Sequence, residues 1–164
     1  MHFDEHLTTR LRDAGKPMLR WWRLMATYGI VVLFVFGVAL ICSGRVPWYS
    51  LMLPVALTHA VTLGLQYVIR RPRPAIAHSA IAMWFRTPSF PSAHSAGSMA
   101  FAVATSAIVL DGSTFGIWAS VSVFAFALLI GISRIMVGVH YVTDVLVGCI
   151  FGIVVSWIFL SVVS

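Results

Sequence analysis

The residues best suited to chemistry in this sequence are two histidines, one aspartate and several arginines in three short segments. These segments read RRPRP at 70–74, PSAH at 91–94, and SR at 133–134 followed by His140 and Asp144. Each segment borders an apolar stretch, where ionisable side chains are costly and tend to be functional. Cations and two imidazoles without a second carboxylate suit phosphate chemistry that needs no metal ion. We therefore expect neither a metal site nor a cofactor.

His140 and Asp144 are four residues apart, a spacing that places both side chains on one face of a helix. A carboxylate in this position can accept the proton of one ring nitrogen, which leaves the other nitrogen free as a nucleophile or base. The same spacing also fits a histidine and an aspartate that merely pack together at a helix start. The pair is therefore a candidate whose role depends on its neighbours.

Arg134 lies six residues before His140 and favours the catalytic interpretation. Its planar guanidinium can bind two phosphate oxygens at once. The alternative is an anchoring arginine whose charge reaches the membrane surface. The neighbouring Ser133 is a candidate phosphate ligand, or else a residue that donates locally or caps the helix.

The tetrapeptide Pro91-Ser92-Ala93-His94 predicts a helix start with Ser92 as the N-cap. The free amides of the first turn and the helix dipole together form an anion site. The small Ala93 lets a phosphate approach this backbone. His94 would then stand beside the phosphate, where it can protonate a leaving oxygen. A capping serine and a helix-end histidine without a catalytic role are the alternative.

The arginines at 70–74 end an apolar segment, and the prolines between them hold the chain extended. This cluster fits phosphate binding, and it also fits a positive patch at the membrane edge. His59, within the preceding apolar segment, is expected to be a hydrogen-bonded residue between helices. His78 and Arg86 follow in the loop, and we expect both to be solvated.

The elements that must position these residues are transmembrane helices. Of the 164 residues, 60% are hydrophobic and only 10% are charged, whereas soluble proteins carry about 25% charged residues. A spanning helix needs roughly 20 mostly apolar residues. The segments that fit this requirement are Leu24–Ile41, Leu51–Ile69, Ser95–Leu110, Thr114–Ile132 and Val145–Val163.

Residues 1–23 mix apolar side chains with arginines and acidic residues, a pattern typical of an amphipathic helix on the membrane surface. Gly15 and Pro17 should interrupt this helix. We therefore expect an all-α fold with one membrane-embedded domain over residues 1–164. It would consist of the interfacial helix and a bundle of about five transmembrane helices over residues 24–164.

Five spans would place the N-terminus, the loop at 70–93 and the loop at 133–140 on one side of the membrane, so the three segments can meet. The net charge of +6 does not indicate nucleic-acid binding, because five of the eleven positive residues lie in the N-terminal segment. The lipid bilayer is the better partner. Gly148 and Gly152, four apart in the last span, predict close helix packing.

Together the three segments resemble the signature of the type-2 phosphatidic-acid phosphatase superfamily, which also includes vanadium haloperoxidases. That signature reads K-x6-R-P, then P-S-G-H, then S-R-x5-H-x3-D. The third part is complete here, from Ser133 to Asp144, and the second has Ala93 in place of glycine. The first is met by Arg-Pro at 73–74, with Gln66 at the lysine position.

The resemblance implies a role for each matched residue. His140 would attack phosphorus and form a phosphohistidine, with Asp144 orienting it, and His94 would be the general acid for the leaving group. The groups that would hold the phosphoryl oxygens and stabilise the transition state are Arg73, Arg134, Ser92 and the Ala93 amide. Water would then hydrolyse the intermediate without a metal.

Gln66 departs from the family pattern, because glutamine offers a neutral donor where lysine adds a positive charge to the phosphate site. Arg70 follows four residues later on the same helical face and is expected to supply the missing cation. Arg70→Ala should then weaken activity sharply. Alternatively, Gln66 marks a changed substrate preference.

We therefore expect an integral-membrane lipid phosphatase that acts on a polyprenyl diphosphate, on phosphatidylglycerophosphate or on phosphatidate. One alternative is a phosphotransferase that passes the phosphoryl group from His140 to another acceptor. The other is a phospholipid-binding or transport protein with weak catalysis. The expected location is a bacterial inner membrane. Charge in the N-terminal segment favours a cytoplasmic active site, but the resemblance favours the external face, which we expect. The sequence does not determine the oligomeric state.

Overall fold

A computed structural model describes residues 2–44, 46–74 and 87–163, and every regular element within these ranges is helical. The expected all-α fold is confirmed. His78 and Arg86 lie outside the described residues. The elements in chain order are α1 (His2–Gly15), the 3-10 turn η1 (Lys16–Met18), α2 (Leu19–Cys42), α3 (Trp48–Ile69), α5 (Ala93–Val109), α6 (Thr114–Met136) and α7 (Val142–Val163).

The five predicted spans correspond to the five long helices of the bundle. In the described part of the chain four helical stretches are long and apolar enough to cross a bilayer, and the shorter α5 is the fifth apolar helix. α2 begins at Leu19 rather than at the predicted Leu24. The extra turn carries Arg20 and Arg23, which stay exposed at the helix end, where a long side chain can keep its charge in water.

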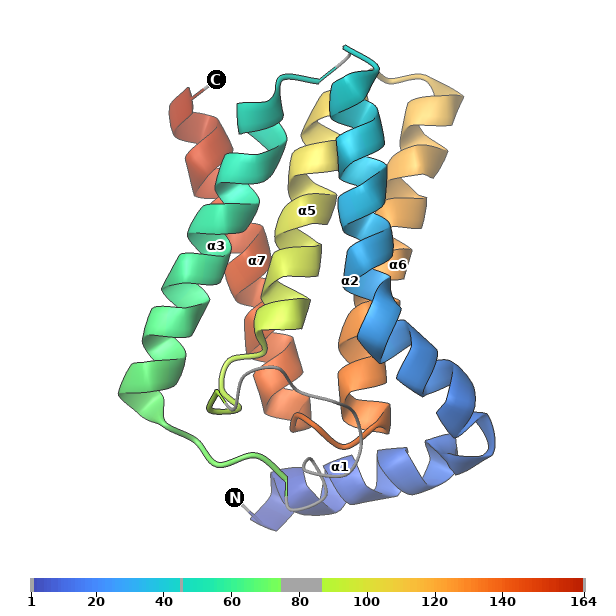
Figure 1. The fold of residues 1–164 in the computed structure, drawn as a ribbon, viewed down its shortest axis with the longest axis vertical. Coiled ribbons are helices and arrows are strands. Elements are labelled where there is room, and N and C mark those ends of the chain that lie inside the picture. The colour runs from blue at the N-terminus through green and yellow to red at the C-terminus, as the bar shows by residue number, and fades with distance from the viewer. Residues whose placement is uncertain (1, 45, 75–86, 164) are drawn as a thin grey trace.

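The helix α5 occupies the centre of the bundle, with α2, α3, α6 and α7 around it (Figure 1). Its sequence allows this position because small side chains face its neighbours: Ala96, Ala100 and Ala104 are completely buried. Large side chains there would keep the surrounding helices apart. The bundle is therefore packed around the helix that begins with the PSAH segment.

The contact between α5 and α7 depends on glycine. A methyl group on Gly152 would lie 2.3 Å from the carbonyl oxygen of Ala96, and one on Gly148 would lie 2.6 Å from the carbonyl oxygen of Ser92. The predicted close packing at these glycines is confirmed. This packing holds the start of α7 against the start of α5, so it brings the last two sequence segments together.

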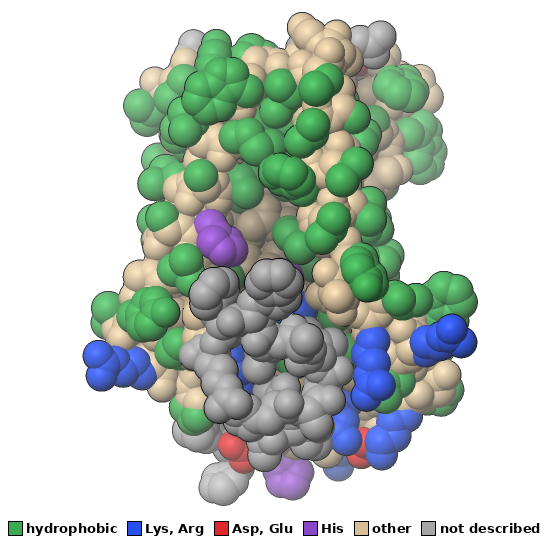
Figure 2. All heavy atoms as spheres, viewed as in Figure 1, with side chains coloured by type: hydrophobic (Ala, Val, Ile, Leu, Met, Phe, Trp, Pro, Cys, Tyr) green, Lys and Arg blue, Asp and Glu red, His purple; other side chains and the backbone are tan. Residues whose placement is uncertain are grey.

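The N-terminal helix lies across the lower end of the bundle (Figure 1). It ends at Gly15, and Pro17 lies in η1, as predicted. Figure 2 shows hydrophobic side chains over the upper part of the molecule and lysine and arginine side chains around the lower end. Apolar bundle helices with a charged helix at one end are typical of a membrane-embedded bundle with an interfacial helix. The chain is an integral membrane protein.

Candidate active site

The three chemistry-bearing segments meet at the end of the bundle where α1 lies. Arg73 Nη1 lies 3.2 Å from His140 Nε2, which joins the first segment to the third. The Ser92 amide donates to the carbonyl oxygen of Asp144 at 2.9 Å, which joins the second segment to the third. The predicted convergence on one side of the bundle is confirmed.

The two ring nitrogens of His140 have different partners. Nδ1 lies 2.8 Å from the carbonyl oxygen of Ser89. A carbonyl can only accept, so Nδ1 carries the proton and Nε2 presents its lone pair toward Arg73. Burial lowers the pKa of His140 to about 4, against the opposing effect of Asp144, so the ring is neutral at pH 7. This is the protonation state that a nucleophilic imidazole needs.

Asp144 lies beside His140, but its shortest contacts are to other groups. Its Oδ2 lies 3.5 Å from His140 Nδ1 and accepts the Tyr141 amide at 2.9 Å, while Oδ1 accepts from Arg71 Nη1 at 2.8 Å. The expectation that Asp144 directly accepts the Nδ1 proton therefore needs correction, because the Ser89 carbonyl is the closer acceptor. The fully buried carboxylate lies close enough to the ring to raise the pKa of His140 against the effect of burial.

Two arginines bring positive charge to the lone-pair side of His140. Arg73 donates through Nε to the Thr87 carbonyl oxygen at 2.8 Å and through Nη1 to the Val139 carbonyl oxygen at 3.1 Å. Burial lowers its pKa, but an arginine remains charged at neutral pH. These carbonyl partners aim the guanidinium without neutralising it, so its charge is available to an anion.

Arg134 is 3% exposed and donates through Nη1 to the carbonyl oxygen of Ala26 at 2.8 Å. Its Nε has no hydrogen-bond partner among the described residues, and within the same residues no carboxylate pairs with it. A buried cation without an anion is costly. Arg134 therefore has the properties of a binding group for an anionic ligand.

The start of α5 supplies the remaining predicted groups. Ser92 is the N-cap, as expected, and its hydroxyl accepts from the Ser95 amide at 3.5 Å. Among the described residues the Ala93 and His94 amides have no acceptor, which leaves two donors at the positive end of the helix dipole. His94 lies within electrostatic range of Arg134 and His140.

Gln66 and Ser133 have structural contacts in place of their predicted phosphate contacts. The Gln66 side chain is buried, and its Nε2 donates to the Pro91 carbonyl oxygen at 2.7 Å. The Ser133 hydroxyl donates to the Ile130 carbonyl oxygen at 2.6 Å, which is the local alternative considered from the sequence. Gln66 thus holds the chain where the PSAH segment begins.

The structure gives no support to the expectation that Arg70 replaces the missing lysine. α3 ends at Ile69, and Arg70 follows in the left-handed conformation with φ of 54°. Because Arg70 lies outside the helix, its spacing from Gln66 no longer places the two side chains on one helical face. Arg70 is exposed, and its Nε donates to the Tyr67 carbonyl oxygen at 2.9 Å.

Ser89 and Arg71 are the site residues that sequence reasoning missed. Ser89 acts through its backbone carbonyl, which has no side-chain signature. Arg71 bonds Asp144 and lies 4.1 Å above the Tyr141 ring, a cation–π contact. Its place in RRPRP was a usable signal, but spacing alone did not distinguish it from Arg70.

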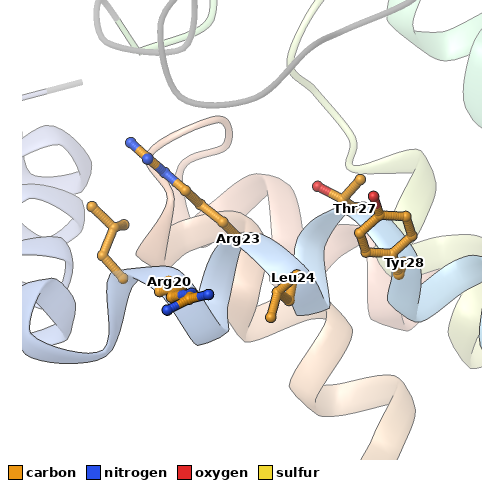
Figure 3. A pocket seen from close by; sticks show the side chains of 6 residues that line it. Arg20, Arg23, Leu24, Thr27 and Tyr28 are labelled. Carbon is orange, nitrogen blue, oxygen red and sulfur yellow. The ribbon is translucent and has the colours of Figure 1, made fainter.

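Two hollows open near this end of the molecule. One, of about 330 Å³, borders the site and is lined by Glu5, Thr8, Thr9, Arg12, Pro74, Gly138 and Tyr141. The other, of about 290 Å³, lies along the first turns of α2, and Figure 3 shows the side chains that line it. It contains none of the predicted catalytic residues. Within the described ranges, no group of three His, Cys, Asp or Glu side chains is placed to bind a metal ion.

Comparison with known sequences gives the same family as the motifs. The sequence profile of the PAP2 superfamily matches residues 47–164. Decaprenylphosphoryl-5-phosphoribose phosphatase of Mycolicibacterium smegmatis is 35% identical over 147 residues, covering 82% of this chain and 74% of that protein. Undecaprenyl-diphosphatase BcrC of Bacillus subtilis is 30% identical over 138 residues, covering 80% and 68%.

Two crystal structures are similar to this fold. Aquifex aeolicus LpxE matches with a TM-score of 0.74 and 27% identity, covering 95% of this chain and 93% of its own. The PAP2 type phosphatidylglycerolphosphate phosphatase from Bacillus subtilis matches with a TM-score of 0.77 over 96% of this chain and 82% of its own. At 22% identity this second likeness shows the fold alone. The matched profile, the relatives and the fold show that this chain belongs to the PAP2 superfamily as a membrane-embedded lipid phosphatase.

Proposed function

We propose that this protein removes a phosphate from a polyprenyl-linked lipid, either a phosphomonoester or a diphosphate, through a phosphohistidine at His140. The observation that carries this proposal is the pair of contacts made by the His140 ring. Nδ1 is held by the Ser89 carbonyl at 2.8 Å, and Nε2 faces Arg73 Nη1 at 3.2 Å. The ring is thus neutral and held in the tautomer that directs its lone pair at a cationic pocket.

Substrate binding begins with the anion. The phosphoryl oxygens would pair with Arg73 and Arg134 and with the free amides of Ala93 and His94. Arg73 Nη1 lies 3.2 Å from Nε2 and donates to its lone pair. A phosphate oxygen is a stronger acceptor for a guanidinium than a neutral imidazole. Binding therefore draws Arg73 off Nε2 and frees the lone pair for attack.

The reaction has two steps. In the first, Nε2 of His140 forms a bond to phosphorus while the bond to the leaving oxygen breaks, and His94 gives that oxygen a proton. In the second, His94 takes a proton from water, the water oxygen bonds to phosphorus, and the phosphorus–nitrogen bond breaks. The guanidiniums stabilise the charge on the equatorial oxygens in both transition states.

The polyprenyl class is proposed because the two relatives named above, which are 35% and 30% identical, have names that specify decaprenyl and undecaprenyl substrates. Phosphatidylglycerophosphate and phosphatidate are the other candidates from the sequence. We also propose that the site opens on the external face of a bacterial inner membrane. Labelling of a cysteine at the exposed Pro72, in a Cys42→Ser and Cys149→Ser background, by an impermeant reagent in intact cells tests this orientation.

The direct test is phosphate release by the purified full chain in detergent with a chelator present. Polyprenyl diphosphate, decaprenylphosphoryl phosphoribose and phosphatidylglycerophosphate are the substrates to compare. Turnover that is lost in His140→Asn and retained in His6→Asn, a change on the exposed face of α1, supports the proposal. Activity that persists in His140→Asn contradicts the assigned nucleophile.

The same assay separates the two alternatives. Phosphate transfer that requires a lipid or sugar acceptor identifies a phosphotransferase. Binding of the lipid phosphates without any turnover identifies a binding or transport protein. A trapped phosphoryl group on His140, stable to base and labile to acid, is expected only for the two enzymatic functions.

A further inference from the structure

The first turn of α7 is capped by side chains from α1. An isolated helix leaves its first backbone N–H groups without partners. Here the Val142 amide donates to Thr8 Oγ1 at 3.3 Å, and the Thr143 amide donates to Asp4 Oδ1 at 3.4 Å. Asp4 and Thr8 are four residues apart, so one face of α1 contacts the end of the helix that carries Asp144.

A buried ion-pair network continues from this cap into the active site. Arg71 bridges two carboxylates, with Nη2 at 2.7 Å from Asp4 Oδ2 and Nη1 at 2.8 Å from Asp144 Oδ1. The side chain of Arg71 is 16% exposed, that of Asp4 10% and that of Asp144 0%. The Thr143 hydroxyl joins Asp4 to Arg71, because it donates to Asp4 and accepts from Arg71. Water therefore cannot readily replace either carboxylate.

The network ends at the imidazole. Asp144 Oδ2 lies 3.5 Å from His140 Nδ1, and its Oδ1 is the atom that Arg71 holds. Without Asp4, Arg71 keeps one anionic partner in place of two and is free to shift. A shift of Arg71 moves the Asp144 carboxylate and, with it, the charge that acts on His140. The position of α1 is thus coupled to the geometry of the reacting ring.

We propose that Asp4 and Thr8 are positioning residues of the active site. In this view α1 is more than a surface anchor, because it completes the N-terminal cap of α7. It also fixes the position of Arg71, and Arg71 in turn fixes the carboxylate of Asp144. Neither residue touches the phosphate. The catalytic part of this proposal rests on the proposed function, whereas the structural part, the capping of α7, does not.

Matched variants of α1 test the catalytic part in the full-length protein. Asp4→Asn should lower kcat about tenfold, the rate equivalent of about 1.4 kcal/mol, with KM unchanged. Its control is Asp13→Asn on the same helix, where the exposed Asp13 pairs only with Lys16 and kcat should stay at the wild-type value. Thr8→Val should also lower kcat, whereas Thr8→Ser, which keeps the hydroxyl, and Thr9→Val, beside it on the exposed face, should not.

Coupling within the network can be measured by a double-mutant cycle. Arg71→Gln combined with Asp4→Asn should be little worse than Arg71→Gln alone, because Asp4 acts through Arg71. Independent, additive losses would overturn the proposed relay. A raised KM with unchanged kcat in Asp4→Asn would also overturn it, because α1 would then act in substrate binding.

Hydrogen exchange at the start of α7 gives a readout that needs no turnover. The amides of residues 142–143 should exchange about tenfold faster in Asp4→Ala and in Thr8→Val than in wild type, the equivalent of about 1.4 kcal/mol, which lies within the range for a lost helix cap. Equal exchange in these variants and in Asp13→Asn would end the capping proposal. If wild type fails to turn over lipid phosphate, the proposed function fails, and the exchange measurement alone still decides the capping.

Discussion

The imidazole Nδ1 of His140 donates to the backbone carbonyl oxygen of Ser89 at 2.8 Å, a bond between residues 51 positions apart in the chain. Because a carbonyl cannot donate, this bond selects the tautomer with a free lone pair on Nε2. It also holds the loop that leads into the second sequence segment against the loop between α6 and α7. A single backbone group thus sets both the chemistry and the placement of the ring.

The pH dependence of activity should report the charge of His140. Burial lowers the pKa of His140 to about 4, and Asp144 opposes this effect. The lone pair therefore takes up a proton as the pH drops through about 4, and kcat/KM should fall over this range. Asp144→Asn removes a group that raises this pKa. The acidic limb of its profile should therefore move to lower pH, while kcat at neutral pH falls. An acidic limb at higher pH in Asp144→Asn would contradict this assignment.

Alanine substitutions at the adjacent Arg71 and Arg70 should have very different effects on kcat and stability. Arg71→Ala removes the partner of the fully buried Asp144 and should lower kcat at least tenfold and reduce stability by about 3 kcal/mol, as for other broken buried ion pairs. Arg70→Ala removes an exposed guanidinium that, among the described residues, bonds only to its own helix end, so kcat should change less than about twofold. The measurements are steady-state kinetics and thermal unfolding in the same detergent.

Catalytic activity should be sensitive to replacement of Arg134 even by lysine. Arg134→Lys retains the positive charge but loses the planar pair of donors, and kcat/KM should fall about 100-fold, a loss typical for a group that stabilises the transition state. Inhibition by inorganic phosphate should weaken in parallel. Arg23→Lys, an exposed change at the start of α2, is the control and should match wild type in both assays.

The Gln66 side chain should contribute to the stability of the fold rather than to the positive charge around the phosphate. Gln66→Leu preserves much of the volume but leaves the buried Pro91 carbonyl oxygen without its donor, at a cost of about 1–3 kcal/mol in the free energy of unfolding. Tyr67→Phe, on the exposed side of the same turn, should unfold like wild type. A stability of Gln66→Leu equal to that of Tyr67→Phe would show that the bond to Pro91 contributes little.

Alanine substitutions at Gly152 and Gly64 distinguish the effect of helix packing on stability from the effect of helix propensity. In Gly152→Ala the new methyl would lie 2.3 Å from the Ala96 carbonyl oxygen, so α5 and α7 must move apart, and both stability and kcat should fall. At Gly64 a methyl group meets nothing within 4 Å. Gly64→Ala should therefore keep full activity and unfold at the same or a higher temperature. The helix separation would disturb the starts of both helices that carry catalytic residues.

The sequence by itself determined the fold class and the helices, and it indicated most of the candidate reacting groups. Uninterrupted apolar runs can only be helical inside a bilayer, because each backbone polar group there needs a partner within its own segment. Two such helices, α5 and α6, separate the second motif segment from the third, and this even number places all three segments on one side. The order and spacing of Arg73, His94, Arg134, His140 and Asp144 were sufficient to indicate the family.

Only the tertiary structure decided which groups orient the reacting ring. Ser89 acts through its carbonyl, and any residue type at that position offers the same atom. The choice of Arg71 over Arg70 depends on the left-handed residue after Ile69, which ends the helix, so helical spacing no longer predicts where these side chains lie. The bond from the Thr143 amide to Asp4 joins residues 139 positions apart, and such a contact exists only once α1 has docked against the bundle.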